Sequence, residues 1–188
     1  MTHDRGTAWT LLCEWTESTN LRKHALAVEA AMRAHARRLS QDEEAFGIVG
    51  LLHDFDYEKS PTVETHVWVG ARVLRAQHWP EPWVKAIEGH ASYTGVARDT
   101  DMARCLFAVD ELTGFLTAAT LVRPDKAIAN VEVPSVLKKM KDKAFARSVN
   151  RDEIRQGAED IGMELQAHIV LVRDAMATIA AELGLPPQ

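Results

Sequence analysis

The residues with the clearest chemical potential are His53 and Asp54, which end the almost wholly apolar segment from Phe46 to Leu52. Two adjacent ionisable groups at the edge of a hydrophobic core are costly unless something pairs with them. A divalent cation would do so, with the imidazole and the carboxylate as its ligands. A helix-end pair exposed to water is the competing interpretation, and the dipeptide alone does not decide between the two.

Two further polar residues fall where the sequence predicts a hydrophobic environment. His24 lies on the apolar stripe of its predicted helix, one turn from Val28, so we expect it to point inward. Asp110 lies in a strongly apolar helical segment, where an unpaired carboxylate would be expensive. Together with the His53–Asp54 pair, these residues come from three helices that can converge, as ligands do in the metal sites of helical bundles.

The hydrophobic pattern is helical nearly throughout and contains no convincing strand. It therefore predicts an all-α fold, a single helical bundle over residues 1–188. Asn20 is the expected cap of the second helix, and Ser40 with Glu43 has the capping-box spacing that opens the third. The expected helices cover 8–15, 20–39, 40–52, 63–77, 83–89, 102–119, one or two segments after the connection 122–134, and 163–183.

Composition places the chain among ordinary globular proteins. It has 188 residues, 46% of them hydrophobic and 26% charged, enough for one domain with a substantial core. No apolar run is long enough to span a bilayer and no signal-peptide pattern is present, so we expect a cytoplasmic protein without a membrane partner. Cys13 and Cys105 form no CxxC pair and are interpreted as buried thiols. The net charge of −5 argues against a duplex nucleic acid as partner but allows a small anionic ligand.

The ordered pattern H…HD…D resembles the HD superfamily of metal-dependent phosphohydrolases. His24 matches the first histidine, His53–Asp54 the pair that names the family, and Asp110 the final aspartate. The resemblance covers 20–115. Within it, the chain is similar to one subgroup of HD hydrolases in two segments, His53-Asp-Phe-Asp-Tyr-Glu and Val109-Asp-Glu-Leu-Thr-Gly-Phe. It implies an HD-type metallohydrolase domain, with residues 120–188 as a helical C-terminal extension.

Two more histidines extend the resemblance. His66 is followed by Val-Trp-Val-Gly-Ala, similar to the family's H-x3-G-A segment, and His90 ends Ile-Glu-Gly-His, which resembles its I-x2-H segment. HD proteins with all six residues usually bind two metals, and Fe or Mn is favoured here over Zn, Co or Ni. The resemblance implies that Asp54 bridges the ions, with His24, His53 and Asp110 on one and His66 and His90 on the other.

The segment after the HD pair departs from the family's patterns. Many members read H-D-[ILM]-G-K, whereas the lysine here, Lys59, comes two residues later. The HD nucleotidases have an acidic residue four positions after the histidine, where this chain has Tyr57. Asp56 and Glu58 are the candidates for donating a proton to the leaving group. Orienting a ligand, or facing solvent, is the alternative, and for Asp56 the orienting role is slightly favoured.

A cationic stretch from Ser135 to Arg151 could hold the phosphate of a substrate. Lys139, Lys143 and Arg147 are four apart and would share one face of a predicted helix. A solvated basic face is the competing interpretation and is favoured over a binding role. The candidate phosphate-binding residues are Lys59, Lys138, Lys139 and Lys143.

The resemblance implies hydrolysis of a phosphoester of a small molecule, a nucleotide being the favoured case, by metal-activated water. Asp54, Asp56 and Glu58 are the candidate catalytic carboxylates. A di-iron oxygenase on the same scaffold is the first alternative, because the same ligand set serves both chemistries. A non-catalytic metal-binding regulatory module is the second, and the complete ligand set argues against it. A homo-oligomer is compatible with the sequence.

Overall fold

The structure, a computed structural model, describes residues 3–186 and contains no strand within them. This confirms the all-α fold that the hydrophobic pattern predicts. Two short 3-10 helices, Ser92–Thr94 and Ile128–Asn130, accompany the α-helices. The α-helices of the described residues are α1 (Arg5–Trp15), α2 (Thr19–Leu39), α3 (Glu43–Leu52), α4 (Trp68–Ala76), α5 (Glu81–His90), α6 (Asp101–Leu121), α7 (Val133–Lys141), α8 (Arg151–Asp160), α9 (Leu165–Ala177) and α10 (Ala180–Leu183).

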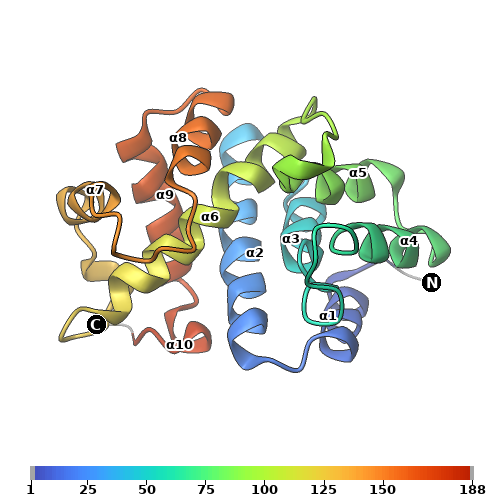
Figure 1. The fold of residues 1–188 in the computed structure, drawn as a ribbon, viewed down its shortest axis with the longest axis horizontal. Helices are drawn as coiled ribbons and strands as arrows, with labels where there is room; N and C mark the ends of the chain where they lie inside the picture. Colours follow the sequence, from blue (N-terminus) through green and yellow to red (C-terminus); the bar gives the residue numbers. More distant parts are fainter. Residues whose placement is uncertain (1–2, 187–188) are drawn as a thin grey trace.

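The two longest helices, α2 and α6, run through the middle of the molecule (Figure 1). Helices α1, α3, α4 and α5 lie on one side of them and α7 to α10 on the other. Helix α2 packs against α3, α6 and α9, and α6 packs against α5 and α8. Side chains on the facing surfaces of α2, α3, α5 and α6 are therefore brought together at the centre of one half of the bundle. None of the described helices is both long and apolar enough to cross a membrane.

Helix α3 is the most deeply buried helix, as its apolar sequence predicts. Every residue from Ala45 to Leu52 is buried. Its N-cap is Asp42, whose carboxylate accepts the backbone N–H groups of Glu44 and Ala45, so the capping box predicted at Ser40 was wrong. Ser40 instead ends α2 in the left-handed conformation, with φ of 54°. The helix ends at Leu52, which delivers His53 to the edge of the core.

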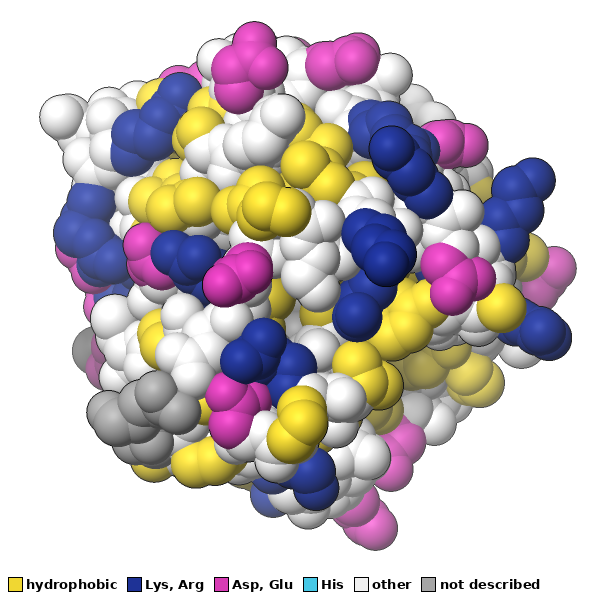
Figure 2. Space-filling model, turned by 90° about the vertical axis from the view of Figure 1, so that its left-hand side faces the viewer, with side chains coloured by type: hydrophobic (Ala, Val, Ile, Leu, Met, Phe, Trp, Pro, Cys, Tyr) yellow, Lys and Arg dark blue, Asp and Glu magenta, His cyan; other side chains and the backbone are white. Residues whose placement is uncertain are grey.

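The C-terminal half differs from the sequence prediction in two places. Helix α7 ends at Lys141, and residues 142–150 form a turn whose carbonyls accept hydrogen bonds from the Arg151 guanidinium, including those of Ala146 at 2.9 Å and Val149 at 2.6 Å. The prediction that Lys139, Lys143 and Arg147 share one helix face was therefore wrong. The single helix expected over 163–183 is divided into α9 and α10. Figure 2 shows the side of the molecule on which these helices lie, where basic side chains are interspersed with acidic and hydrophobic ones.

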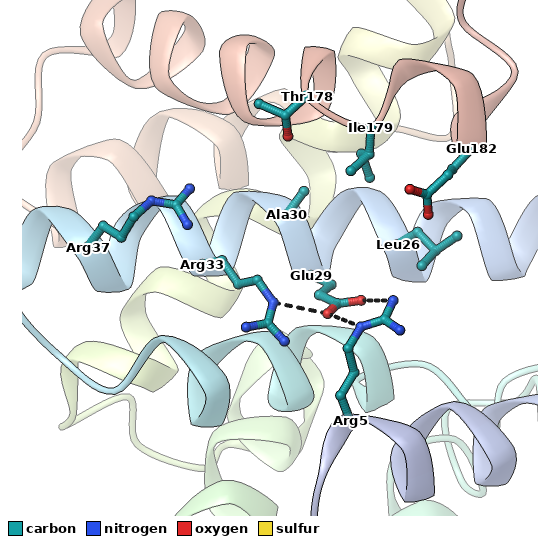
Figure 3. A pocket seen from close by; sticks show the side chains of 9 residues that line it. All are labelled: Arg5, Leu26, Glu29, Ala30, Arg33, Arg37, Thr178, Ile179 and Glu182. Carbon is teal, nitrogen blue, oxygen red and sulfur yellow. Dashed lines mark hydrogen bonds and ion pairs between the residues drawn. The ribbon is translucent and has the colours of Figure 1, made fainter.

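An ion-pair cluster joins the N-terminal helices (Figure 3). Glu29 on α2 is 4% exposed and accepts two hydrogen bonds from Arg5 at 2.6 and 2.9 Å, and one from Arg33 at 3.0 Å. Arg33 also pairs with Glu44 at 2.9 Å. A Cβ at Gly47 would lie 2.5 Å from the Arg33 guanidinium, so only glycine leaves room for this arrangement. The cluster ties α1 and α3 to α2, and it lines a pocket of about 210 Å³ beside α10.

The packing of α2 against α9 buries two histidines. His35 and His168 are 0% exposed, and their ring centroids are 5.1 Å apart. The Nε2–H of His168 donates to the Ala108 carbonyl at 3.0 Å, whereas neither nitrogen of His35 has a hydrogen-bond partner in the part of the chain that the structure describes. Burial, reinforced by the nearby His168 and Arg38, lowers the pKa of His35 from 6.5 to about 3. His35 is therefore neutral in the folded protein at neutral pH.

We expect His35→Leu to reduce the acid sensitivity of the fold. Because the pKa of His35 is depressed, the unfolded chain binds the extra proton between about pH 3 and 6.5, and stability falls as the pH drops through this window. From pH 7 to 4.5 this one residue should cost roughly 2–3 kcal/mol of unfolding free energy. At pH 7 the leucine variant should be no less stable than wild type, because no hydrogen bond is lost.

The measurement is the free energy of unfolding in urea at pH 7 and pH 4.5. His78→Asn is the control, because His78 is exposed and has a φ of 61° that asparagine tolerates. An unchanged pH dependence in His35→Leu would contradict the assignment.

Candidate metal centre

Six residues that the sequence singles out converge between α2, α3, α5 and α6. They arrive from five separate places in the chain. One histidine is the last residue of its helix, a histidine–aspartate pair directly follows another helix, one histidine lies in a turn, and the other two residues lie inside the long central helices. They are His24 in α2, His53 and Asp54 after α3, His66 in the turn before α4, His90 at the end of α5 and Asp110 in α6. The long-range packing of the bundle thus collects residues that are up to 86 positions apart.

The ligand atoms fall into two overlapping groups. Around Asp110, the Oδ1 atom lies 2.9 Å from Nε2 of His24 and 3.4 Å from Nε2 of His53. Around Asp54, the Oδ1 atom lies 3.1 Å from Nε2 of His66 and 3.2 Å from Nε2 of His90. Asp54 belongs to both groups, because its Oδ2 atom is 3.5 Å from Nε2 of His53. Two triplets that share Asp54 are compact enough to hold an ion. In His24–His53–Asp54 and in Asp54–His66–His90, the three ligand atoms all lie within 4.8 Å of one another.

Helix ends orient two of the histidines. The last carbonyls of a helix have no partner within the helix, so they can accept a side-chain hydrogen bond. The Nδ1–H of His53 donates to the Gly50 carbonyl at 2.8 Å, and that of His90 donates to the Ile87 carbonyl at 2.6 Å. With the proton held on Nδ1, the Nε2 lone pair of each ring is directed into the cluster, which is the tautomer that a metal ligand needs.

Asp56 does the same for the third histidine. One of its oxygens accepts Nδ1–H of His66 at 2.9 Å, and the other accepts the backbone N–H of Gly70 at 2.7 Å. The carboxylate is 1% exposed and lies behind His66. A Cβ at Gly70 would lie 3.0 Å from the Asp56 carboxyl carbon, so the glycine permits this close approach. The geometry favours the interpretation that Asp56 orients a ligand.

The turn before α4 carries His66, and the residue after it, Val67, has a strained backbone conformation. The sequence predicts a helix from Val63, but α4 begins only at Trp68. Val67 has φ of +70°, a conformation that is costly for a β-branched residue, and its side chain is fully buried. Such strain, on the order of 1–3 kcal/mol, persists only where the surrounding structure demands it, and it clusters at functional sites.

The electrostatics of the cluster favour bound positive charge. Burial acts to lower the pKa of His53, but the charges of Asp54 and Asp110 outweigh it and raise that pKa. For His66, burial is likewise outweighed by hydrogen bonds to Asp54 and Asp56, which raise the pKa to about 9. Protons are thus held where a cation would otherwise neutralise the carboxylates. Even so, Nε2 of His53 and Oδ1 of Asp54 are buried, and neither has a hydrogen bond of good geometry to any of residues 3–186.

The donor set fits a divalent transition metal. Imidazole nitrogens suit Fe, Zn and Ni, and carboxylates suit Mn, whereas calcium and magnesium sites are built mainly from oxygen. Four inward Nε2 atoms and two carboxylates therefore suit the metals that the sequence favours. The unpaired buried atoms of His53 and Asp54 are where such a cation would bind.

The remaining candidates from the sequence are not brought to the cluster. Glu58 accepts the backbone N–H groups of Glu17 and Ser18 at 2.7 and 3.0 Å, which ties down the turn between α1 and α2. The ammonium of Lys59 donates to the Glu14 carbonyl at 2.9 Å and lies over the ring of Trp15. The other three lysines lie on or just after α7, which packs on α6 and α9: Lys138, Lys139 and Lys143.

Three residues near the cluster were not identified from the sequence. The ring of Tyr57 stands edge-on to His66, with centroids 5.0 Å apart. Tyr93 is 47% exposed, and burial together with the charges of Asp54 and Asp56 raises its pKa to about 12, so the phenol keeps its proton. Burial, reinforced by the neighbouring Asp110, raises the pKa of Glu111 to about 7. Adjacency to the motifs could have indicated Tyr57 and Glu111, whereas nothing in the sequence points to Tyr93.

Comparison with known proteins supports the fold. No protein-family model and no curated protein matches the sequence. Among solved structures, the HD domain of the L. monocytogenes phosphodiesterase PgpH is similar, with a TM-score of 0.55 and 14% identity over 91% of this chain and 97% of that one. The same domain in complex with cyclic-di-AMP gives a TM-score of 0.52 and 14% identity, over 91% and 96%. The chain therefore has the fold of an HD domain, as the resemblance predicts.

Proposed function

We propose that this chain is a metal-dependent phosphohydrolase that cleaves a phosphoester of a small molecule, with a nucleotide as the favoured substrate class. The observation that carries the proposal is the convergence of four Nε2 atoms on the carboxylates of Asp54 and Asp110, at the centre of an HD-type fold. One ion would be held by His24, His53, Asp54 and Asp110, and a second by Asp54, His66 and His90. Bound metal supplies Lewis-acid polarisation of phosphoryl oxygens and activation of water.

The protein's own contribution is to hold and shield these ligands. The His53 side chain is 0% exposed and that of His90 is 5% exposed, so this side of the cluster is closed to solvent. The side chains of His24, Asp54 and Asp110 are 24%, 22% and 22% exposed, so substrate approaches from their side. Preorganised ligands need no rearrangement as charge develops on the phosphoryl group, which is the main source of catalysis in such sites.

Tyr93 is suited to assist at the mouth of the cluster. It keeps its proton at neutral pH and is within electrostatic influence of Asp54, Asp56 and Tyr57. It can therefore donate a hydrogen bond to a phosphoryl oxygen or to a leaving group. The solved complex of the PgpH HD domain with cyclic-di-AMP supports a nucleotide as the substrate class, because the two domains share a fold.

The test is phosphate release by metal-defined protein. Protein stripped with a chelator and reloaded separately with Mn, Fe, Zn, Co or Ni should release phosphate or nucleotide from a panel of phosphomonoesters and diesters, and a chelator should abolish the activity. Activity should track metal content, because the ligand histidines are occupied and leave no free general base among themselves. Absence of turnover across the panel, with consumption of O2 by iron-loaded protein on an organic substrate, would assign the oxygenase chemistry instead.

A further inference from the structure

One pocket of the molecule is lined by a residue of the metal cluster, His24. It has a volume of about 280 Å³ and runs from the ligand His24 between the N-terminal part of α2 and the C-terminal half of α6. Leu183 and Leu185, on either side of Gly184 at the end of α10, form one wall, and the half-exposed Leu121 also lines the pocket. Because His24 is on the solvent-accessible side of the cluster, a molecule bound at the metals would extend into this pocket.

The pocket contains an unpaired cation. Lys23 lines it beside His24, and its ammonium has no hydrogen-bond or ion-pair partner among residues 3–186. The Lys23 ammonium lies close to Gly184 in the C-terminal segment, because a Cβ built at Gly184 would be 2.6 Å from the Lys23 nitrogen. The arginines of the pocket in Figure 3 differ in this respect, because Arg5 and Arg33 are already paired with Glu29. An anionic group entering from the metal side would find its free counter-charge at Lys23.

A glycine keeps the pocket open. Gly114, one turn after Asp110 on α6, also lines it, and a Cβ built there would meet nothing within 4 Å. Glycine inside a helix is less favourable than alanine, and no close packing requires it at Gly114. The position is therefore one where a larger side chain would fill the pocket without disturbing the core.

We propose that this pocket binds the organic group of the phosphoester, with Lys23 contacting the phosphate and Gly114 leaving space for a single nucleobase-sized moiety. This inference rests on the proposed function, because it takes the metal cluster as the phosphate site. Three leucines, Leu121, Leu183 and Leu185, give the pocket an apolar part that suits an uncharged organic group, and the volume of about 280 Å³ is just below the ~300–1,000 Å³ typical of small-molecule sites. The site thus takes a mononucleotide or a compact phosphomonoester in preference to a cyclic dinucleotide.

The experiment measures binding of adenosine 5′-monophosphate, cytidine 5′-monophosphate, cyclic-di-AMP and inorganic phosphate to the metal-loaded full chain by calorimetry. Wild type should bind at least one mononucleotide more tightly than phosphate and more tightly than cyclic-di-AMP. Gly114→Leu should weaken binding of that mononucleotide by about tenfold or more, because the leucine side chain would occupy the space that the organic group fills. Gly114→Ala should have a smaller effect of the same sign. Metal content, measured in parallel, should be unchanged in both variants, as should phosphate affinity.

Lys23 is tested against a lysine outside the pocket. Lys23→Gln should weaken the binding of both mononucleotide and phosphate, whereas Lys139→Gln, on α7, should weaken the binding of neither. Mononucleotide affinity unaltered by Gly114→Leu, or no preference of wild type for any mononucleotide over phosphate, would overturn the inference. The two proposals fail in distinguishable ways. Mononucleotide binding that depends on Gly114, without turnover of any ester, would contradict the proposed hydrolase activity alone. Turnover that is unaffected by Gly114→Leu would contradict the proposed binding pocket alone.

Discussion

Replacing Asp54 by alanine should empty both metal sites and abolish phosphoester hydrolysis. Asp54 is the one residue in both ligand groups, with Oδ1 facing His66 and His90 and Oδ2 facing His53. Its removal takes away a negative charge from each site and leaves neighbouring imidazoles without their carboxylate. We expect the metal content of purified protein to fall towards zero. Turnover should fall by at least about a hundredfold, the scale for loss of one electrostatic contact at a reacting centre.

The measurement is elemental analysis of wild type and variant after identical loading and gel filtration, with activity measured on the same samples. Asp152→Ala is the matched control, because its side chain is 96% exposed at the start of α8, and it should retain full metal content. Far-ultraviolet circular dichroism identifies any variant that fails to fold, and Asp54→Asn, which conserves the side-chain volume, then replaces it. An Asp54→Ala protein that is folded and fully loaded would show that the metal centre lies elsewhere.

Replacing His66 or His90 by alanine should remove one ion and leave the other. Both Nε2 atoms face Oδ1 of Asp54, on the side of the cluster away from His24 and Asp110. Each variant should therefore retain about one equivalent of metal where wild type holds two. Turnover should still fall by about a hundredfold or more, because a single ion cannot stabilise both the attacking and the leaving oxygen.

The orienting carboxylate provides a second, milder change at the same site. Asp56→Asn keeps the size of the side chain but weakens its hold on the His66 ring, so the ion bound by His66 should lose about 10–100-fold in affinity. His24→Ala is the converse variant and should remove the other ion while the His66 site stays filled. Loss of both ions from His66→Ala would show that the two ions do not bind independently. Loss of neither ion would show that His66 is not a ligand.

The fold class could be predicted from the sequence alone, and the candidate metal ligands could be named from it. Helical periodicity runs through almost the whole chain, and periodicity is a local property that burial then reinforces, so the all-α fold could be predicted without a structure. His24 and Asp110 could be selected because each is a polar residue on an apolar stripe, where burial without a partner is costly. His66 and His90 were identified only through their resemblance to family segments, because neither has such a local signal.

Only the tertiary structure decided which polar residues meet. Asp56 and Glu58 look alike in sequence, two acidic residues after the same motif, yet one holds His66 and the other binds the turn between α1 and α2. The cationic stretch could not be judged from spacing, because α7 ends at Lys141, where the backbone turns and Arg151 binds its carbonyls. The pocket at Gly114 depends on the end of α10 returning to α2. Contacts between distant segments follow from packing the whole chain, and no local pattern encodes them.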